Sequence, residues 1–227
     1  MEKLLNNPVY KALISGNQKL ALGTATVKYF PEDVSPFAGF EHDYEKGFGE
    51  LYDLFPSGRK ILYASPLHIY QHKGWLLLHK VPGLQFVFDT GYKISRPSFT
   101  PLPLGEEHIG QMMQLAALTK PGPFGTRTIE FGNYYGFFEN AQLIAMTGQR
   151  LHVQNFAEVS AVCTHPDHLG KGYASALVQH QVQLIVDAGE TPFLHVREDN
   201  LRAIEVYRRL GFKVSGTMNF YFLQREE

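Results

Sequence analysis

The chain has 227 residues, enough for one or two ordinary domains. Its 21 Lys+Arg and 22 Asp+Glu give a formal net charge of −1 at pH 7, so no excess of positive charge marks it as a nucleic-acid binder. The single cysteine, Cys163, excludes a disulfide framework within the chain and a cysteine-based zinc finger.

Apolar runs in the sequence are short. None approaches the roughly 18 residues of a membrane-spanning helix, and residues 1–8 contain no apolar stretch of signal-peptide length. We therefore expect a cytoplasmic protein with no membrane or nucleic-acid partner, either a monomer or a homodimer.

Prolines punctuate the first 97 residues, and short elements are expected between them. Hydrophobic periodicity and β-propensity predict two helices and three strands there: helices over 8–28 and 44–55, and strands over 60–64, 75–80 and 84–89. A proline-rich stretch from Arg96 to Leu104 predicts a linker. We place a domain boundary near residue 97 and expect a smaller α/β lobe over 1–97.

The second part, 98–227, begins with a short strand and a helix, continues with antiparallel strands and ends in a strand–helix–strand–helix tail. The elements predicted after the first strand are helices over 106–118, 126–132, 173–188 and 200–210, and strands over 134–139, 142–151, 156–164, 192–197 and 213–223. This order predicts an α/β or α+β fold with a mixed sheet.

A Gly-x-Gly pair, Gly170 and Gly172, joins the strand at 156–164 to the long helix after it. Glycines leave backbone N–H groups uncovered, and the start of the helix adds the positive end of its dipole. Together they predict an anion site suited to a phosphate or pyrophosphate. Taken alone, the two glycines are equally consistent with a tight turn that binds nothing.

Two other phosphate-binding motifs fit less well. A Walker A loop needs Ser or Thr after its lysine, but Gly172 follows Lys171. A dinucleotide-binding motif would read Gly170-x-Gly172-x-x-Ser175, with Ser175 where the third glycine belongs and only the 52 residues from Ala176 to Glu227 after it. A NAD-dependent oxidoreductase remains a distant alternative.

A second block supports a different interpretation. The segment from Val196 to Phe212 carries Asn200, an Ala three residues on, a Tyr four beyond that, and then Gly-Phe. It resembles the C-terminal signature of the GNAT superfamily of N-acyltransferases, and the segment from Val162 to Ala174 resembles the coenzyme A pyrophosphate loop of that family. The resemblance covers about 98–227. It departs from the family at Leu169, where many members have Arg.

Two further segments, 121–124 and 156–166, resemble bacterial members with an extra N-terminal domain, akin to the glycine N-acyltransferase-like branch. The resemblance implies a GNAT-type mixed, mostly antiparallel central sheet flanked by helices. It also implies acetyl-CoA as co-substrate, no metal, and direct transfer of the acetyl group to a primary amine on a small molecule or peptide. We expect residues 1–97 to be a degenerate half of the same fold.

The resemblance also implies which residues bind coenzyme A. They are Val162, Cys163, Thr164, His168, Leu169, Gly170, Lys171, Gly172, Tyr173, Ala174, Asn200, Ala203 and Tyr207. Asn200 and Tyr207 are seven residues apart, so they share a helix face with Ala203 between them. By resemblance, Tyr207 is the general acid that protonates the leaving thiolate, and a backbone N–H within Val162–Thr164 faces the thioester carbonyl.

Glu158 is the candidate general base, since a carboxylate in an apolar strand should have a pKa raised by desolvation. It stands four residues before Val162, and strand alternation predicts that the two share a face while Cys163 points away. Two alternatives stay open: Glu158 is a rim carboxylate bonded to backbone or arginine, or a water molecule is the base. Arg127 and Glu130 either grip a charged acceptor or form a solvated helix face.

Two further features are not expected to take part in catalysis, and one non-catalytic function stays open. Cys163 is expected to be a buried structural thiol. His165 and His168 lie three residues apart, but no further ligand completes a metal site. The same fold would also serve a non-catalytic acyl-CoA sensor, which would need neither Tyr207 nor Glu158.

Overall fold

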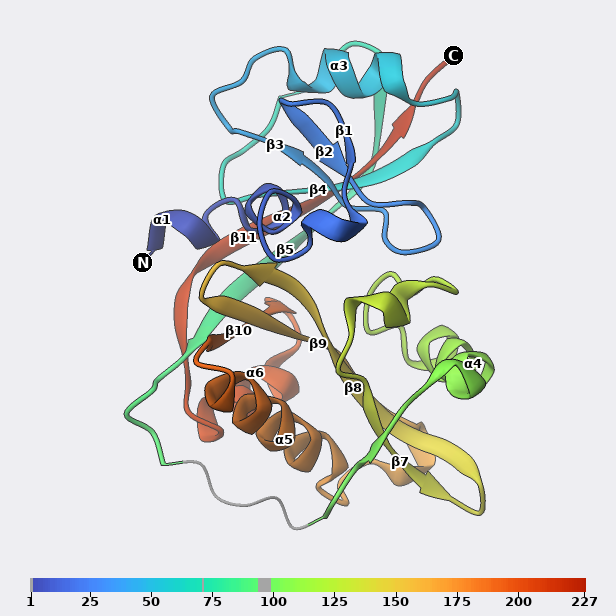
Figure 1. Ribbon diagram of the computed structural model, residues 1–227, viewed down its shortest axis with the longest axis vertical. Coiled ribbons are helices and arrows are strands. Elements are labelled where there is room, and N and C mark those ends of the chain that lie inside the picture. Colours follow the sequence, from blue (N-terminus) through green and yellow to red (C-terminus); the bar gives the residue numbers. More distant parts are fainter. Residues whose placement is uncertain (1, 71, 94–98) are drawn as a thin grey trace.

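A mixed, mostly antiparallel sheet forms the body of the molecule (Figure 1). The structure is a computed structural model, and it describes residues 2–70, 72–93 and 99–227. Eight strands lie in the order β4-β11-β5-β10-β9-β8-β7-β6, and all neighbours are antiparallel except β9 and β10. The bounds are β4 Lys60–Ser65, β5 Trp75–Phe88, β6 Leu102–Pro103, β7 Tyr135–Glu139, β8 Gln142–Val153, β9 Phe156–Thr164, β10 Thr191–Arg197 and β11 Phe212–Arg225. This is the sheet that the sequence predicted, and it lacks the parallel order of a dinucleotide-binding fold.

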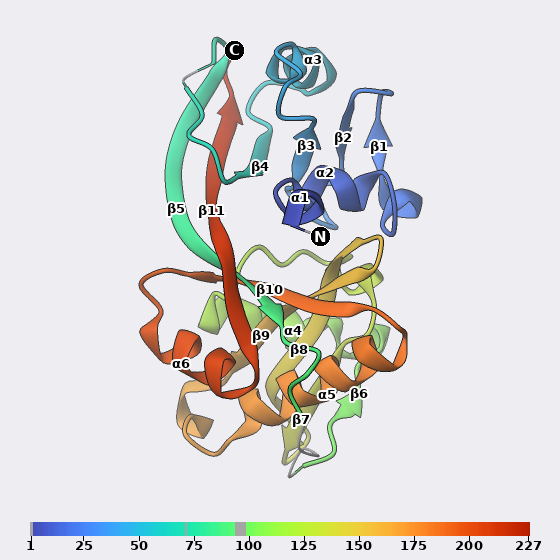
Figure 2. The ribbon, with the colours of Figure 1, turned by 90° about the vertical axis from the view of Figure 1, so that its left-hand side faces the viewer.

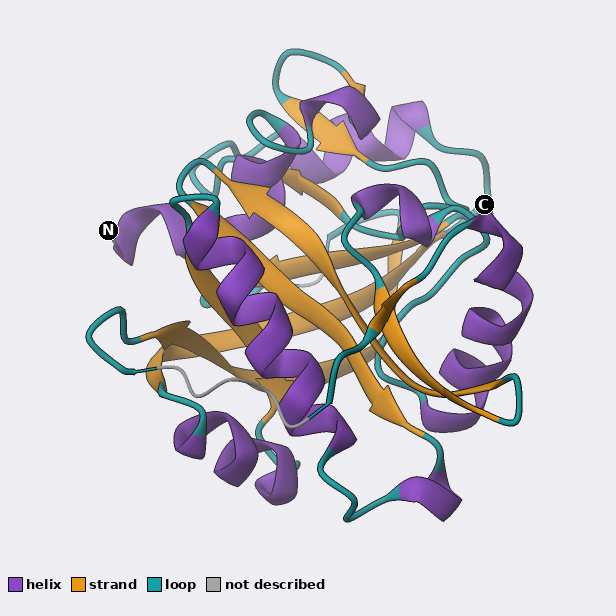
Figure 3. Cartoon of the chain, turned by 60° about the horizontal axis from the view of Figure 1, so that its bottom comes forward, coloured by secondary structure: helices purple, strands orange, loops and turns teal. Residues whose placement is uncertain are grey.

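Helices cover both faces of this sheet. On one face, α5 (Tyr173–Asp187) and α6 (Leu201–Arg209) pack Val178, Val182 and Ile204 against β9 and β10. Figure 3 shows α5 lying across the strands. On the other face lie α2 (Pro8–Leu13) and α4 (Ile109–Thr119), whose apolar residues join Met146, Phe193 and the rest of the largest core cluster. The sheet is therefore the middle layer of three.

The part of the chain before residue 97 is joined to the main sheet. It includes α1 (Glu2–Leu5), α3 (Gly47–Leu54) and a three-stranded sheet of β1 (Leu22–Gly23), β2 (Val27–Tyr29) and β3 (Ala38–Phe40). Its β4 and β5 pair with β11 and β10, so strands from both sides of the predicted boundary share one sheet. Figure 2 shows β5 and β11 running side by side from one part to the other. The boundary itself, within 94–98, lies outside the described residues.

The helix expected over 8–28 is wrong beyond Leu13. The chain turns at Gly16, where an added Cβ would lie 2.5 Å from the Cβ of His152, and Asn17 Oδ1 accepts a hydrogen bond from the His152 N–H at 2.8 Å. This turn docks on β8, and β1 and β2 follow it. Contacts with a distant strand thus override the local helical pattern.

The two strands expected over 75–80 and 84–89 are the single strand β5, which continues through Pro82. On one edge β5 has β11 throughout, whereas on the other edge β10 lies beside it only from Gly83 onward. At Pro82 the β10 ladder has ended, and only the Glu198 N–H just beyond β10 donates to Pro82 O, at 3.2 Å. A proline fits there because no strand residue needs its N–H.

The remaining predicted elements agree with the structure apart from their ends and one replacement. In the segment predicted as a helix over 126–132 a 3-10 turn, η3 (Thr128–Phe131), is found instead. No helix in residues 2–70, 72–93 and 99–227 combines the length and apolarity needed to span a membrane.

Candidate active site

The site lies where two neighbouring strands separate. β10 pairs with β9 only at Thr191–Phe193, opposite Phe156–Glu158, and beyond that point each strand has a partner on its outer edge only. A cavity of about 640 Å³ occupies the region of this gap, lined by residues 159–162 of β9 and 195–197 of β10. N–H groups of β9 that point into the gap have no facing strand, so they are free to bind a ligand there.

A bulge in β9 decides which side chains face which side. Ala161 has φ +53°, unusual for a residue other than glycine, and the β8–β9 register shifts next to it. Before the bulge Ala157 and Val159 face α5, but after it Val162 takes that face while Cys163 turns to the opposite core. The alternation expected from sequence is therefore wrong: Glu158 shares a face with Cys163, not with Val162.

The loop after β9 has the backbone expected of an anion site. Gly170 and Gly172 have φ of +81° and +87°, a left-handed conformation that favours glycine. The helix α5 starts directly after Gly172, and neither a capping side chain nor an acidic residue covers its first turn. Its first N–H groups are therefore uncovered, which is the backbone arrangement that an anion site needs. Leu169, the departure from the family pattern, is half exposed beside them.

Several side chains of this loop contact one another or residues of β7. His168 Nδ1 lies 3.3 Å from Lys171 Nζ and 3.7 Å from Glu139, and His165 Nδ1 accepts a hydrogen bond from the backbone N–H of Asp167 at 3.3 Å. The centre of the Tyr173 ring lies 5.1 Å from that of Phe137, and Ala174 is half-buried. Thr164 Oγ1 is buried and has no hydrogen-bond partner among the described residues. These residues border the anion site rather than the cavity.

Replacing Gly172 with alanine is expected to weaken coenzyme A binding at least tenfold. The left-handed conformation costs an L-residue about 1–2 kcal/mol, so the loop moves to another conformation in which its N–H groups no longer face the ligand. Gly189, at the other end of α5, is a matched control with φ +78° and open space around it. Calorimetric titration with coenzyme A checks this. Equal affinity losses in Gly172→Ala and Gly189→Ala would contradict a role for the loop in binding.

Helix α6 supplies the polar groups at one end of the cavity. Asn200 is its N-cap and accepts a hydrogen bond from the N–H of Ala203 at 3.2 Å, and Asn200 and Tyr207 both line the cavity. Burial raises the pKa of Tyr207 to about 12, and the neighbouring Cys163 adds to the shift. The phenol therefore holds its proton throughout the neutral range. Burial likewise raises the pKa of Cys163 to about 11, so its sulfur is an inert thiol.

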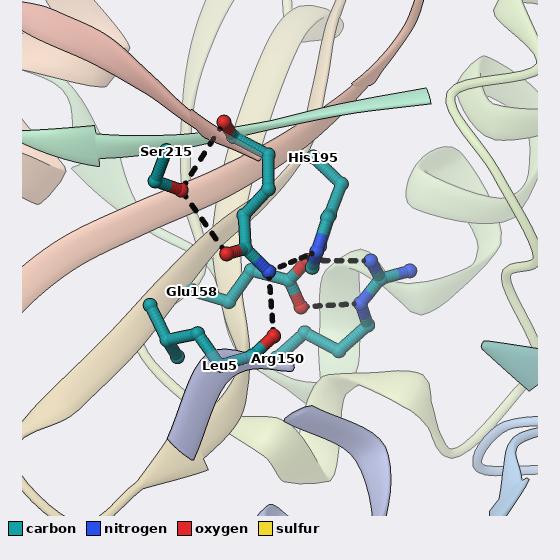
Figure 4. A network of polar contacts seen from close by, with 6 residues as sticks. Leu5, Arg150, Glu158, His195 and Ser215 are labelled. Carbon is teal, nitrogen blue, oxygen red and sulfur yellow. Dashed lines mark hydrogen bonds and ion pairs between the residues drawn. The ribbon is translucent and has the colours of Figure 1, made fainter. Parts of the chain in front are cut away.

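Glu158 lies beneath the cavity, fully buried and fully paired (Figure 4). Arg150 donates from Nε and Nη2 to its two oxygens, each at 2.8 Å, and His195 Nδ1 lies 2.7 Å from Oε1. Burial alone raises the pKa of Glu158, but the charge and hydrogen bonds of Arg150 and then His195 outweigh it and hold the pKa at about 2. The raised pKa expected from sequence is wrong. Of the alternatives left open, bonding to an arginine is the one found, although Glu158 is buried rather than at a rim.

His195 shares this network but has no free ring nitrogen. Gln85 Nε2 donates to Leu5 O at 2.8 Å and lies 3.0 Å from His195 Nε2, while Ser215 Oγ meets Gln85 Oε1 at 3.1 Å. With an amide N–H aimed at it, Nε2 is an acceptor, so Nδ1 carries the proton and donates to Glu158. Both ring nitrogens are therefore engaged within the network, and neither is available to a substrate.

Mostly aromatic side chains from both parts of the chain line the rest of the cavity, here called the aromatic wall. They are Phe37 just before β3, Leu62 of β4, His79 of β5, Phe124 of the loop after α4, and Phe220 and Phe222 of β11. Arg127 and Glu130 pair with each other at 2.9 Å, are exposed and lie outside the cavity wall. Of the predicted coenzyme A residues, Val162, Asn200 and Tyr207 line the cavity.

No motif in the sequence had pointed to Arg150, to His195 or to the aromatic wall as parts of the site. One signal was available for Arg150, because the predicted strands at 142–151 and 156–164 are consecutive and each holds one charge in an apolar run. The aromatic wall had no such signal, since Phe37 and Phe220 are brought together only by the folded sheet.

Comparisons with known proteins agree with this geometry. A family model described as FR47-like protein matches residues 134–222. A putative acetyltransferase of the GNAT family from Novosphingobium aromaticivorans is 28% identical, with 99% of each chain covered and a TM-score of 0.87. A GCN5-related N-acetyltransferase from Kribbella flavida is 14% identical over 98% of this chain and 96% of its own, with a TM-score of 0.66, and supports the fold alone. A search of curated proteins found no match.

Proposed function

Because the chain is a member of the GNAT superfamily, we propose that it is an N-acyltransferase that moves an acyl group, most readily acetyl, from acyl-CoA to a primary amine. The observation that carries this proposal is the cavity between the separating ends of β9 and β10. Tyr207 lines this cavity, and the open N-terminus of α5 follows β9 after the loop 165–172. A long thioester with a pyrophosphate at its far end suits this arrangement.

The amine attacks the thioester carbonyl directly in a ternary complex. The new C–N bond forms first and gives a tetrahedral oxyanion, which N–H groups of β9 in residues 159–164 stabilise. The C–S bond then breaks as the carbonyl re-forms. Tyr207 donates its proton to the departing sulfur and regains one from water. The proton lost by the amine passes to water, because Glu158 is fully buried with its pKa held at about 2, and both ring nitrogens of His195 are engaged.

The test is release of free coenzyme A from acetyl-CoA over a panel of amines, amino acids and peptides. Turnover with at least one amine, with the acetyl group recovered on nitrogen, is expected. Tight coenzyme A binding with no turnover on any amine would contradict the enzyme and favour the acyl-CoA sensor. Stabilisation against heat by NAD but not by acetyl-CoA would contradict both.

A further inference from the structure

The guanidinium of Arg150 borders the cavity with one nitrogen unused. Its Nε and Nη2 bind Glu158, whereas Nη1 has no acceptor in residues 2–70, 72–93 and 99–227. The side chain is 14% exposed, forms part of the cavity wall and holds its Cζ 4.9 Å from the centre of the Phe37 ring. In Figure 4 the third guanidinium nitrogen is turned away from the carboxylate. Arg150 is thus held in place by Glu158, and its Nη1 is a hydrogen-bond donor available to a ligand.

The charged side chains that line this cavity are all basic, although Arg197 is already paired with Asp199 at 2.6 Å. Lys120, Arg150 and Arg197 line the cavity, and no Asp or Glu is among the described residues of its wall. Glu158 lies below the surface and is fully used by its two partners. An acceptor that carries an ammonium group besides its reacting amine has no carboxylate in this wall to pair with. An acceptor that carries a carboxylate does find a cationic partner here.

Apolar side chains line the cavity that Arg150 borders. Phe37, Leu62, Val81, Phe220 and Phe222 are among them, and all but Val81 pack in a different core cluster from Tyr207. The Phe220 ring is 5.3 Å from the His195 ring, which places this wall next to the buried network. The pocket therefore suits an apolar body beside a single anionic group.

We propose that Arg150 Nη1 binds a carboxylate of the acceptor, and that the acceptor is an amine bearing that carboxylate next to an apolar group. An aromatic α-amino acid is the simplest molecule of this class. The proposal rests on the proposed N-acyltransferase function. A carboxylate could also arrive on the acyl group, as in succinyl-CoA, so the experiment separates the two sources.

The experiment compares L-phenylalanine with L-phenylalaninamide as competing acceptors of acetyl-CoA in one mixture with the full chain. Both compete for the same folded molecules, so the ratio of their kcat/KM values does not depend on how much protein is folded. A hydrogen bond to a charged group predicts that Arg150→Lys lowers the ratio, acid over amide, by about 10- to 100-fold. The variant Arg150→Gln/Glu158→Gln removes both buried charges and should do the same.

Arg59→Lys is the matched control. Arg59 is also an arginine paired with a carboxylate, Glu32 at 2.6 Å, and placed over an aromatic ring, Phe55 at 5.3 Å, but it is not part of the cavity wall. It should leave the ratio unchanged. A second readout needs no turnover: calorimetric binding of N-acetyl-L-phenylalanine to the coenzyme A complex should weaken in Arg150→Lys and not in Arg59→Lys.

Each outcome decides. An unchanged ratio in Arg150→Lys overturns the proposal, and so does a preference for succinyl-CoA over acetyl-CoA that depends on Arg150. If no acceptor releases coenzyme A but N-acetyl-L-phenylalanine binds in an Arg150-dependent way, the carboxylate site stands and the proposed function fails. If neither turnover nor such binding is found, the carboxylate site is overturned as well.

Discussion

Tyr207→Phe is expected to lower kcat about 100-fold while leaving coenzyme A affinity within about threefold. Burial keeps the phenol protonated at neutral pH, with a pKa raised to about 12, so its hydroxyl is available to the sulfur that leaves. The ring itself packs near Phe86 and Phe212, at 6.3 Å and 6.1 Å, and phenylalanine preserves this packing. Steady-state kinetics with acetyl-CoA and the best acceptor of the panel give kcat, and calorimetry gives the affinity.

Tyr63→Phe is the control for this loss. Tyr63 is also buried with a raised pKa, but it lies in the cluster around Phe48 and Trp75, away from the cavity wall. The kcat of Tyr63→Phe should match that of the unaltered protein. If Tyr207→Phe retains kcat within about threefold, the phenol takes no part in proton transfer and another group or water protonates the sulfur.

The part of the fold after residue 98 could be predicted because its signals are local. The strand β9, the two glycines and the helix α5 follow one another within some thirty residues, and their periodicity is strong. The same holds for α6, where an N-capping Asn200 and a closing Gly211 mark the two ends. Each of these elements lies within a few residues of its predicted position.

The first part was harder because its structure depends on distant partners. β5 is held between β11, more than a hundred residues later, and β10, and no local pattern reveals that its two halves form one strand. The segment after Leu13 has an apolar spacing that suits a helix, but it turns at Gly16 to dock on β8. Long-range pairing, not propensity, decides the structure in both places.

The sequence predicted those features of the candidate site that depend on a single helix or strand. It did not predict those that depend on a side chain of another strand. Tyr207 and Asn200 face the cavity because of helical spacing alone. For Glu158 the sequence indicated burial correctly, but its protonation state is set by Arg150 on the next strand and His195 on another. The bulge at Ala161 turns the Cys163 side chain to the other face of the sheet, and an alanine in the sequence does not indicate a positive φ.

Glu158→Gln is expected to lower the free energy of unfolding by roughly 3 kcal/mol at pH 7. A pKa lowered from its ordinary value of 4.5 to about 2 corresponds to this amount, at about 1.36 kcal/mol per pH unit. The amide also leaves the buried guanidinium of Arg150 without a countercharge, a change that costs about 3–5 kcal/mol in comparable buried pairs. Urea unfolding followed by circular dichroism measures the difference.

The pH dependence of that difference tests its cause. Because the folded pKa lies below the unfolded value, the contribution of Glu158 is complete above about pH 4.5 and is lost as the pH falls toward 2. The gap between the two proteins should therefore shrink to about 1 kcal/mol at pH 3. Glu205→Gln, which breaks an exposed pair with Arg208 at 3.2 Å, should change stability by less than about 0.5 kcal/mol at either pH. A gap for Glu158→Gln that stays constant from pH 7 to pH 3 would mean that lost packing, not the buried charge pair, causes the destabilisation.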